Sequence, residues 1–260
     1  MKSPLREPAG GSKSIALLKE KIPAGSVVDS FLFLGGEIEC NLADNNRFVV
    51  AHTSRYVIYE FWRCILGDAQ RVADIVTHLY PLDSNAYHSK RMFYLLQENW
   101  PTYKDPFMRS ALFYLLNRCS QDGHISAGEF ADEHLTSRGL SQLRAFTVDN
   151  LHVSWDQSED DFMIGFEKVA PDSTLLIRAN PFSYNYFEEG KSKGFEMTTL
   201  YHKDLANRLQ QLRDRKWIVI YDYHKGVSAL YPGSNIQMIN QYGRPTEHEH
   251  ACKELLIANF

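Results

Sequence analysis

Two hydrogen-bond acceptors lie next to each other just after a short apolar run. Residues 175–177 (LLI) precede Asn180, which carries a side-chain oxygen, and Pro181, which offers its carbonyl. Both oxygens can accept the hydrogens of an amino group. The next two positions are Phe182 and Ser183. This stretch is the first candidate for chemistry, because an apolar run that forms a buried strand would hold both acceptors at the strand's end.

A second candidate lies near the C-terminus, where His248, His250 and Cys252 alternate along the chain. On a strand these side chains share one face and could hold a metal. A polar turn before the last strand is the alternative, and we favour it, so we expect no metal site. The four cysteines lack C-x-x-C spacing and indicate reduced, mostly buried thiols in a cytosolic protein.

The first part of the chain contains the elements that must position such residues. Residues 12–23 have apolar side chains at helical spacing, and residues 54–66 form a second amphipathic stretch after a serine. Residues 26–36 and 47–52 are continuous apolar runs, as in buried parallel strands, and the first ends in two glycines. Strand, glycine-rich turn, helix, strand and helix form the first half of a doubly wound sheet.

A helical region follows before the strands return. We expect helices at residues 68–80, 86–98, 107–118 and 139–146, with a long surface hairpin or loop at 117–139. Strands are expected at 151–155, 173–180, 216–222, 234–242 and 253–259, and helices at 158–169, 202–215 and 224–232.

The composition is that of a globular protein. The chain has 260 residues, of which 44% are hydrophobic, and its net charge is −4. No apolar run approaches the roughly 18 residues that span a bilayer, and the N-terminus has no signal-peptide core. We therefore expect a cytoplasmic protein with no membrane partner. The mild negative charge counts against a dedicated nucleic-acid binder.

Taken in order, six segments resemble the DNA adenine methylase family. They are PLREPAGGSKSIALLKEKIP, VVDSFLFLGGEIECNL, FYLLNRCSQDGHIS, LLIRANPFSYNYF, HKDLANRLQQLRDRKWIVIYDYHKGVSALYPG and KELLIANF. The resemblance implies a methyltransferase-like, doubly wound and mostly parallel sheet. Its core would comprise residues 1–68 and 147–260, and residues 69–146 would be an inserted helical and hairpin target-recognition region.

The resemblance also implies a site for S-adenosylmethionine over the glycines that follow the first strand. The corresponding residues are Phe33, Gly35 and Gly36. Depending on alignment, either Leu34 or Glu37 takes the place of a required glycine. Leucine would crowd the ligand, and glutamate would bring a negative charge near the ligand's carboxylate.

Lys13 persists from the family's opening motif, but the acid that should bind the ribose at the end of the second strand does not. His52 or Thr53 stands there instead. A carboxylate accepts both hydrogen bonds of a ribose diol, whereas a neutral histidine accepts one. Losing a charge-assisted hydrogen bond typically costs about 1.5–3 kcal/mol.

The apolar run and the residues after it fall where the family has its Asp-Pro-Pro-Tyr tetrad. Asn180 and Pro181 keep the two acceptors that hold the target amino group, but Phe182 replaces the rigid second proline. Ser183 cannot stack on a flipped base, a contact that typically contributes about 1–3 kcal/mol.

The inserted region would contact double-stranded DNA. Asn117, Arg118 and Ser120 lie where the family's DNA-reading hairpin begins, and His124 and Arg138 bracket its loop. Arginine can bind guanine or phosphate. Acidic residues in the same loop would repel phosphate.

The glycine turn, the ribose acid and the stacking aromatic are thus altered together. We expect a degenerate, catalytically inactive member of the family that acts as a DNA-binding or a protein-interaction subunit. The alternative is an active adenine-N6 DNA methyltransferase that uses S-adenosylmethionine and a variant Asn-Pro-Phe-Ser tetrad.

Overall fold

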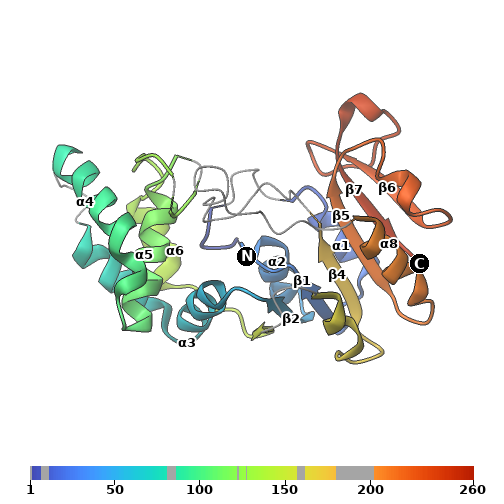
Figure 1. The fold of residues 1–260 in the computed structure, drawn as a ribbon, viewed down its shortest axis with the longest axis horizontal. Helices are drawn as coiled ribbons and strands as arrows, with labels where there is room; N and C mark the ends of the chain where they lie inside the picture. Colours follow the sequence, from blue (N-terminus) through green and yellow to red (C-terminus); the bar gives the residue numbers. More distant parts are fainter. Residues whose placement is uncertain are drawn as a thin grey trace.

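The structure is a computed structural model that describes residues 2–6, 12–80, 86–121, 123–126, 128–156, 162–179 and 202–260. Within these ranges the chain forms a single seven-stranded sheet with helices packed against it (Figure 1). No helix in these ranges is long and apolar enough to cross a membrane.

The sheet is mostly parallel, with one reversed strand. Its order is β3-β2-β1-β4-β5-β7-β6, and β7 runs antiparallel to both β5 and β6. The expected α/β class with a mostly parallel sheet is confirmed. The strands are β1 (Val27–Phe31), β2 (Phe48–Thr53), β3 (Leu151–Trp155), β4 (Thr174–Arg178), β5 (Trp217–Asp222), β6 (Asn235–Asn240) and β7 (Cys252–Ala258).

Both faces of the central strands are buried, which explains why their sequences are continuously apolar. In β4, Leu176 packs into one core cluster, whereas Leu175 and Ile177 pack into the cluster on the opposite face. The first cluster includes side chains of α1 (Ile15–Lys21), α2 (Glu37–Asp44) and α3 (Tyr56–Leu79). The second includes side chains of the 3-10 helix η2 (Phe162–Glu167) and of α8 (His202–Gln211).

Helix α3 contains the break that the sequence predicted between residues 66 and 68. Asp68 has non-helical angles (φ −157°, ψ 79°), and its Oδ1 accepts a hydrogen bond from the backbone N–H of Arg71 at 2.9 Å. Asp68 therefore caps the second half of α3, as aspartate does at helix starts. The expected helices at 54–66 and 68–80 are these two halves.

Residues 69–146, which the resemblance makes an inserted region, contain α4 (Ala86–Asn99), η1 (Trp100–Thr102), α5 (Pro106–Arg118) and α6 (Ser137–Arg144), of which the three α-helices were expected. In Figure 1 these α-helices lie at one end of the molecule and β5–β7 at the other. The expected hairpin is present: Ser120 and Phe130 form an antiparallel bridge. It is not wholly a surface loop, because Ile125 and Leu135 are buried in the core.

Several expected helices differ from the prediction in the described residues, and α8 ends at Gln211 instead of 215. Of residues 158–169, only η2 is helical, while residues 157–161 lie outside the described residues. The backbone of Gly165 packs against the Phe31 ring, where an added Cβ would lie 2.7 Å from a ring carbon. In residues 224–232 only η3 (Ser228–Leu230) forms, next to Pro232, a poor helix former. A last 3-10 turn, η4 (Glu249–Ala251), precedes β7.

The N-terminal residues tie the inserted region to the sheet. The backbone N–H of Arg6 donates to Oδ1 of Asn117 at 2.8 Å, and the Asn117 amide donates to the Arg6 carbonyl at 3.0 Å. Three residues earlier, the Ser3 hydroxyl donates to the carbonyl of Gly35. The same short segment thus contacts both α5 and the turn that follows β1.

The turn before α1 is anchored on the last strand by one carboxylate. Glu254 of β7 is buried and accepts hydrogen bonds from the Ser12 hydroxyl (3.0 Å) and the Lys13 backbone N–H (2.9 Å). It also accepts from the backbone N–H (2.9 Å) and the hydroxyl (2.6 Å) of Ser14. Buried carboxylates are retained when donors compensate for lost water, and here four donors do so.

Replacing this carboxylate by an amide is expected to destabilise the fold. Glu254→Gln keeps the size of the side chain but places an NH₂ group, itself a donor, opposite N–H and hydroxyl donors. The free energy of unfolding should therefore fall by about 2 kcal/mol. Urea unfolding measures it. The control is Glu247→Gln at an exposed position, which should change stability by less than about 0.5 kcal/mol. Equal losses in both variants would contradict the role of Glu254.

Candidate functional site

The candidate site lies at the carboxyl ends of the parallel strands. Strand β1 pairs with β2 on one side and with β4 on the other. The chain therefore builds the sheet outward from β1 first on one side and then on the other, which makes the β1–β4 boundary a topological switch point. Ligands of open α/β sheets bind beside such a switch point. Phe33, Gly35 and Gly36 follow β1, and His52 lies in β2. The tetrad at residues 180–183 lies outside the described residues.

Gly36 is in contact with the indole of Trp62. Gly36 has a left-handed conformation (φ 75°), and a Cβ built on it would lie 2.3 Å from Cζ2 of Trp62. Trp62 is fully buried, and its Nε1–H donates to the carbonyl of Leu34 at 3.0 Å. The Phe33 ring packs beside it, with centroids 5.2 Å apart. A side chain of α3 therefore packs against the bare backbone of this glycine.

The two residues expected to replace a family glycine have other contacts. Leu34 is half-buried and supplies the carbonyl that Trp62 uses. Glu37 is the first residue of α2, and its Oε2 accepts from the Ser12 backbone N–H at 3.1 Å. Sequence reasoning missed Trp62, which no local pattern connects with position 36. Leu32, just after β1, takes a left-handed conformation (φ 61°), which is strained for leucine.

His52 is held between two carboxylates. Its Nε2 lies 2.8 Å from Oδ1 of Asp29, and its Nδ1 lies 3.0 Å from Oδ2 of Asp156. The Phe31 ring stacks on the imidazole at a centroid distance of 4.4 Å and an interplanar angle of 8°. Asp29 is in the middle of β1, His52 is near the end of β2, and Asp156 directly follows β3. Three neighbouring strands thus bring these groups together.

The two contacts of His52 cannot both be hydrogen bonds if the ring is neutral and both carboxylates are ionised. A neutral imidazole donates from one nitrogen only, so both contacts are hydrogen bonds when the ring carries two protons or one carboxyl carries a proton. Asp29 is buried, whereas the Asp156 side chain is 36% exposed. The sequence did contain a signal for Asp29, because an acid inside an otherwise apolar strand implies a buried polar partner.

Lys13, the other expected cofactor residue, contributes its backbone N–H to Glu254. Glu254 is paired in register with Asp222 at the end of β5. Partial loss of hydration first, and then the Glu254 charge, raise the pKa of Asp222 above its usual value, although Asp222 is exposed at the end of β5. A raised carboxyl pKa means that the folded state loses stability as the pH rises through that pKa, because the ionised form is disfavoured.

The expected DNA-contacting residues have different environments. Asn117 and Ser120 are fully buried; the Asn117 amide also donates to the Gly123 carbonyl at 2.8 Å. Arg118 is half-buried, donates to the Pro4 carbonyl and lies over the Tyr114 ring. His124 is half-buried, whereas Arg138 is exposed on α6. Of these residues, Arg138 is the one with an exposed side chain.

The histidines near the C-terminus stack on each other, with ring centroids of His248 and His250 5.5 Å apart, while Cys252 is buried. Among the described residues, no group of three His, Cys, Asp or Glu side chains could hold a metal ion.

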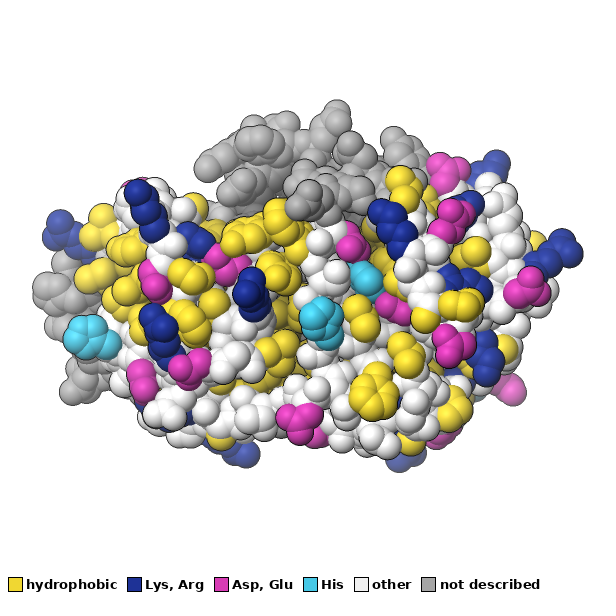
Figure 2. Space-filling view, turned by 90° about the horizontal axis from the view of Figure 1, so that it is seen from below, with side chains coloured by type: hydrophobic (Ala, Val, Ile, Leu, Met, Phe, Trp, Pro, Cys, Tyr) yellow, Lys and Arg dark blue, Asp and Glu magenta, His cyan; other side chains and the backbone are white. Residues whose placement is uncertain are grey.

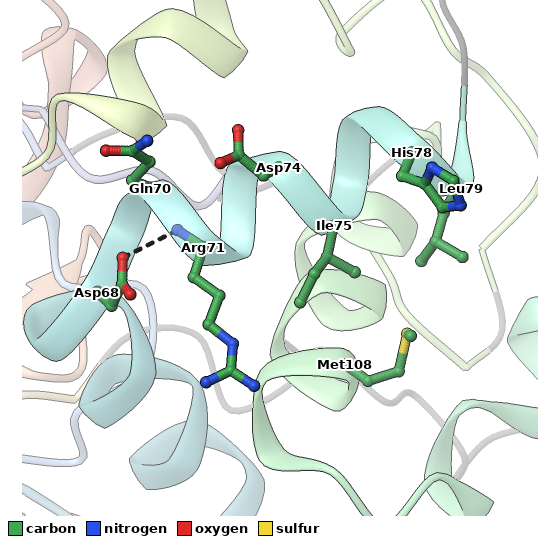
Figure 3. Close-up of a pocket in the computed structure, with 8 residues that line it drawn as sticks. All are labelled: Asp68, Gln70, Arg71, Asp74, Ile75, His78, Leu79 and Met108. Atoms are coloured by element: carbon green, nitrogen blue, oxygen red, sulfur yellow. Dashed lines mark hydrogen bonds between the residues drawn. The ribbon is translucent and has the colours of Figure 1, made fainter.

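A groove of about 580 Å³ lies away from the strand ends, beside the second half of α3. Figure 3 shows Arg71 and Ile75 on the side of the helix that faces Met108 of α5. Asp74, on its rim, is paired with Arg144 at 2.7 Å. None of its lining residues lies in β1, β2 or β3 or in the turns directly after these strands, so this groove is separate from the candidate site.

The Trp62 contact makes a quantitative prediction for Gly36. Gly36→Ala should cost about 1–2 kcal/mol for the left-handed conformation and about 1–3 kcal/mol more for overpacking against the indole. Gly233→Ala is the control, because Gly233 has φ +80° with nothing within 4 Å of its added Cβ. Thermal or urea unfolding measures both. If the two variants lose the same stability, the indole does not crowd Gly36.

Comparison with known proteins assigns no family to the chain. No protein-family model matches the sequence. No curated protein matches it either.

Proposed function

We propose that the protein is a DNA adenine methylase-like protein that does not transfer methyl groups and that serves as a binding scaffold. The observation that carries the proposal is the packing of Trp62 against Gly36. The family resemblance would place S-adenosylmethionine over this glycine turn, because a ligand there packs against bare backbone. An indole that already makes this contact leaves no equivalent surface for the ligand.

The residues around the turn do not suit S-adenosylmethionine in the manner of the family. Leu34 contributes its carbonyl to Trp62, and His52 replaces the ribose-binding acid. Asp29 is buried and committed to His52. We therefore assign no catalytic step to this site. The mostly parallel sheet with its helical insertion supports a methyltransferase-like scaffold. In this proposal the packed fold presents a surface that binds DNA or a protein partner.

One observation favours the alternative of an active enzyme. Asp156 follows β3 next to His52, and its side chain is partly exposed. A carboxylate here could accept ribose hydroxyls in place of the acid missing from β2. The alternative therefore predicts cofactor binding that depends on Asp156, whereas the scaffold proposal predicts none.

Calorimetry with S-adenosylmethionine separates the two. The scaffold proposal predicts no heat of binding at ligand concentrations well above the micromolar range, because the glycine turn is filled. Labelled cofactor and varied duplex DNA should likewise show no methyl transfer. Low-micromolar binding that is weakened in Asp156→Asn, together with methyl transfer, would instead establish the enzyme.

Duplex DNA is the partner that the resemblance suggests, and Arg138 is the residue best placed to test it. If the insertion binds DNA, affinity should fall steeply with salt, and Arg138→Ala should weaken binding and reduce the salt slope by about one. Arg118→Ala is a poorer probe, because Arg118 holds the Pro4 carbonyl. Fluorescence anisotropy measures the affinity.

The matched control is Arg213→Ala, an exposed arginine between α8 and β5. It should leave duplex binding unchanged. Absence of binding even at low salt would remove duplex DNA as a partner and leave a protein partner for the scaffold.

A further inference from the structure

A cluster of aromatic side chains lies exposed beside the candidate site. Tyr56 and Trp155 are 46% and 38% exposed, and Tyr59 is half-buried between them and Arg63. Tyr56 and Tyr59 lie one turn apart on α3, and Trp155 is the last residue of β3. We call Tyr56, Tyr59, Arg63 and Trp155 the aromatic patch.

The rings of the aromatic patch are held in fixed positions. The Trp155 Nε1–H donates to the carbonyl of Ser54 at 3.1 Å. Tyr56 meets Trp155 edge-on at a centroid distance of 4.9 Å, and Tyr59 lies more nearly parallel to it at 6.3 Å and 26°. Ordered rings lose little conformational entropy when they bind a ligand, so this surface is prepared to accept one.

Arg63 is the charged side chain of the aromatic patch. Burial, and then the charge of nearby Glu60, raise the pKa of Tyr56. Glu60 shares the same side of α3 but is buried in an ion pair with Arg109, and hydrogen bonding to Glu60 raises the Arg109 pKa. Asp156 faces His52. Arg63, in contrast, is exposed, and its guanidinium lies 6.0 Å from the Tyr59 ring centroid. Glu60 is thus ion-paired and Asp156 contacts His52, while Arg63 remains at the surface.

Exposed rings next to an arginine are the chemistry that binds single-stranded nucleic acid. Aromatic faces stack on bases, and arginine contacts the phosphate and stacks as well. A duplex hides its base faces, so this chemistry favours an unpaired strand. Figure 2 shows, from below, hydrophobic side chains interleaved with Lys, Arg, Asp and Glu over the part of the molecule that contains α3.

We propose that the aromatic patch is a binding surface for single-stranded nucleic acid, with bases stacking on Tyr56 and Trp155 and a phosphate at Arg63. This proposal does not rest on the proposed scaffold function, because the patch is distinct from the glycine turn and from the hairpin of the inserted region.

The test is fluorescence anisotropy of the full chain at low salt with labelled oligothymidylate and oligouridylate of about 15 nucleotides, and with a labelled duplex. Tyr56→Ala should weaken binding of the single strand by about 5- to 100-fold. Tyr56→Phe keeps the ring and should bind within about two-fold of the parent protein. Arg63→Ala should weaken binding and lower the salt slope by about 0.7.

The control is Tyr242→Ala. Tyr242 is 78% exposed and follows β6, the edge strand opposite to β3 in the sheet. It should bind like the parent. Binding of either oligonucleotide with this variant pattern supports the proposal, and the two arms show whether DNA or RNA is preferred. No binding of either, equal binding by Tyr56→Ala, or a preference for duplex would overturn it; the first result would point to a protein ligand.

Discussion

The contact between Trp62 and the turn after β1 determines how the two parts of the molecule meet. The indole can reach the backbone of Gly36 because glycine has no side chain and tolerates a left-handed conformation. Its N–H then reaches the Leu34 carbonyl, so the buried polar atom is satisfied. Because Trp62 belongs to α3, which packs on α5, this contact also fixes the inserted helices relative to the sheet. Burying a tryptophan of this size typically stabilises a fold by about 3–5 kcal/mol relative to alanine.

Buried charges near the strand ends follow the same requirement, that each one has a partner. His52 lies between Asp29 and Asp156. Glu254 receives donors from the turn before α1. Removing one partner of such a group leaves an uncompensated buried charge, so we expect substitutions here to destabilise the fold more than substitutions at exposed positions. Among the described residues, the groups at the ends of β1 and β2 thus contact other groups of the protein.

Local patterns in the sequence predicted most elements. The apolar runs predicted the seven strands of the sheet except for details of their ends, and the separate helices expected at 54–66 and 68–80 predicted the break in α3. The hairpin was expected from its polar, glycine-containing sequence. Of the helix expected at 158–169, the described residues form the 3-10 helix η2, where Gly165 packs on Phe31, a residue far away in the chain.

The site was less predictable for the same reason. Position 36 was recognised as a glycine turn, but its partner Trp62 lies on the next helix but one, and nothing in the intervening sequence links the two. His52 was identified, whereas its partners Asp29 and Asp156 required the order of β1, β2 and β3. Asn117 was expected to contact DNA, yet its amide binds the backbone of Arg6, a contact across 111 positions of sequence.

The most direct test of the filled glycine turn is the indole N–H signal of Trp62 in nitrogen–proton NMR. The chain has four tryptophans, so the signals can be assigned by single replacements such as Trp62→Phe. With S-adenosylmethionine well above the micromolar range, the Trp62 signal should stay in place and its proton should exchange slowly with water, because the N–H is buried and bonded to the Leu34 carbonyl. A ligand-induced shift of that signal, or rapid exchange of that proton, would show that the turn opens to the ligand and would contradict the account.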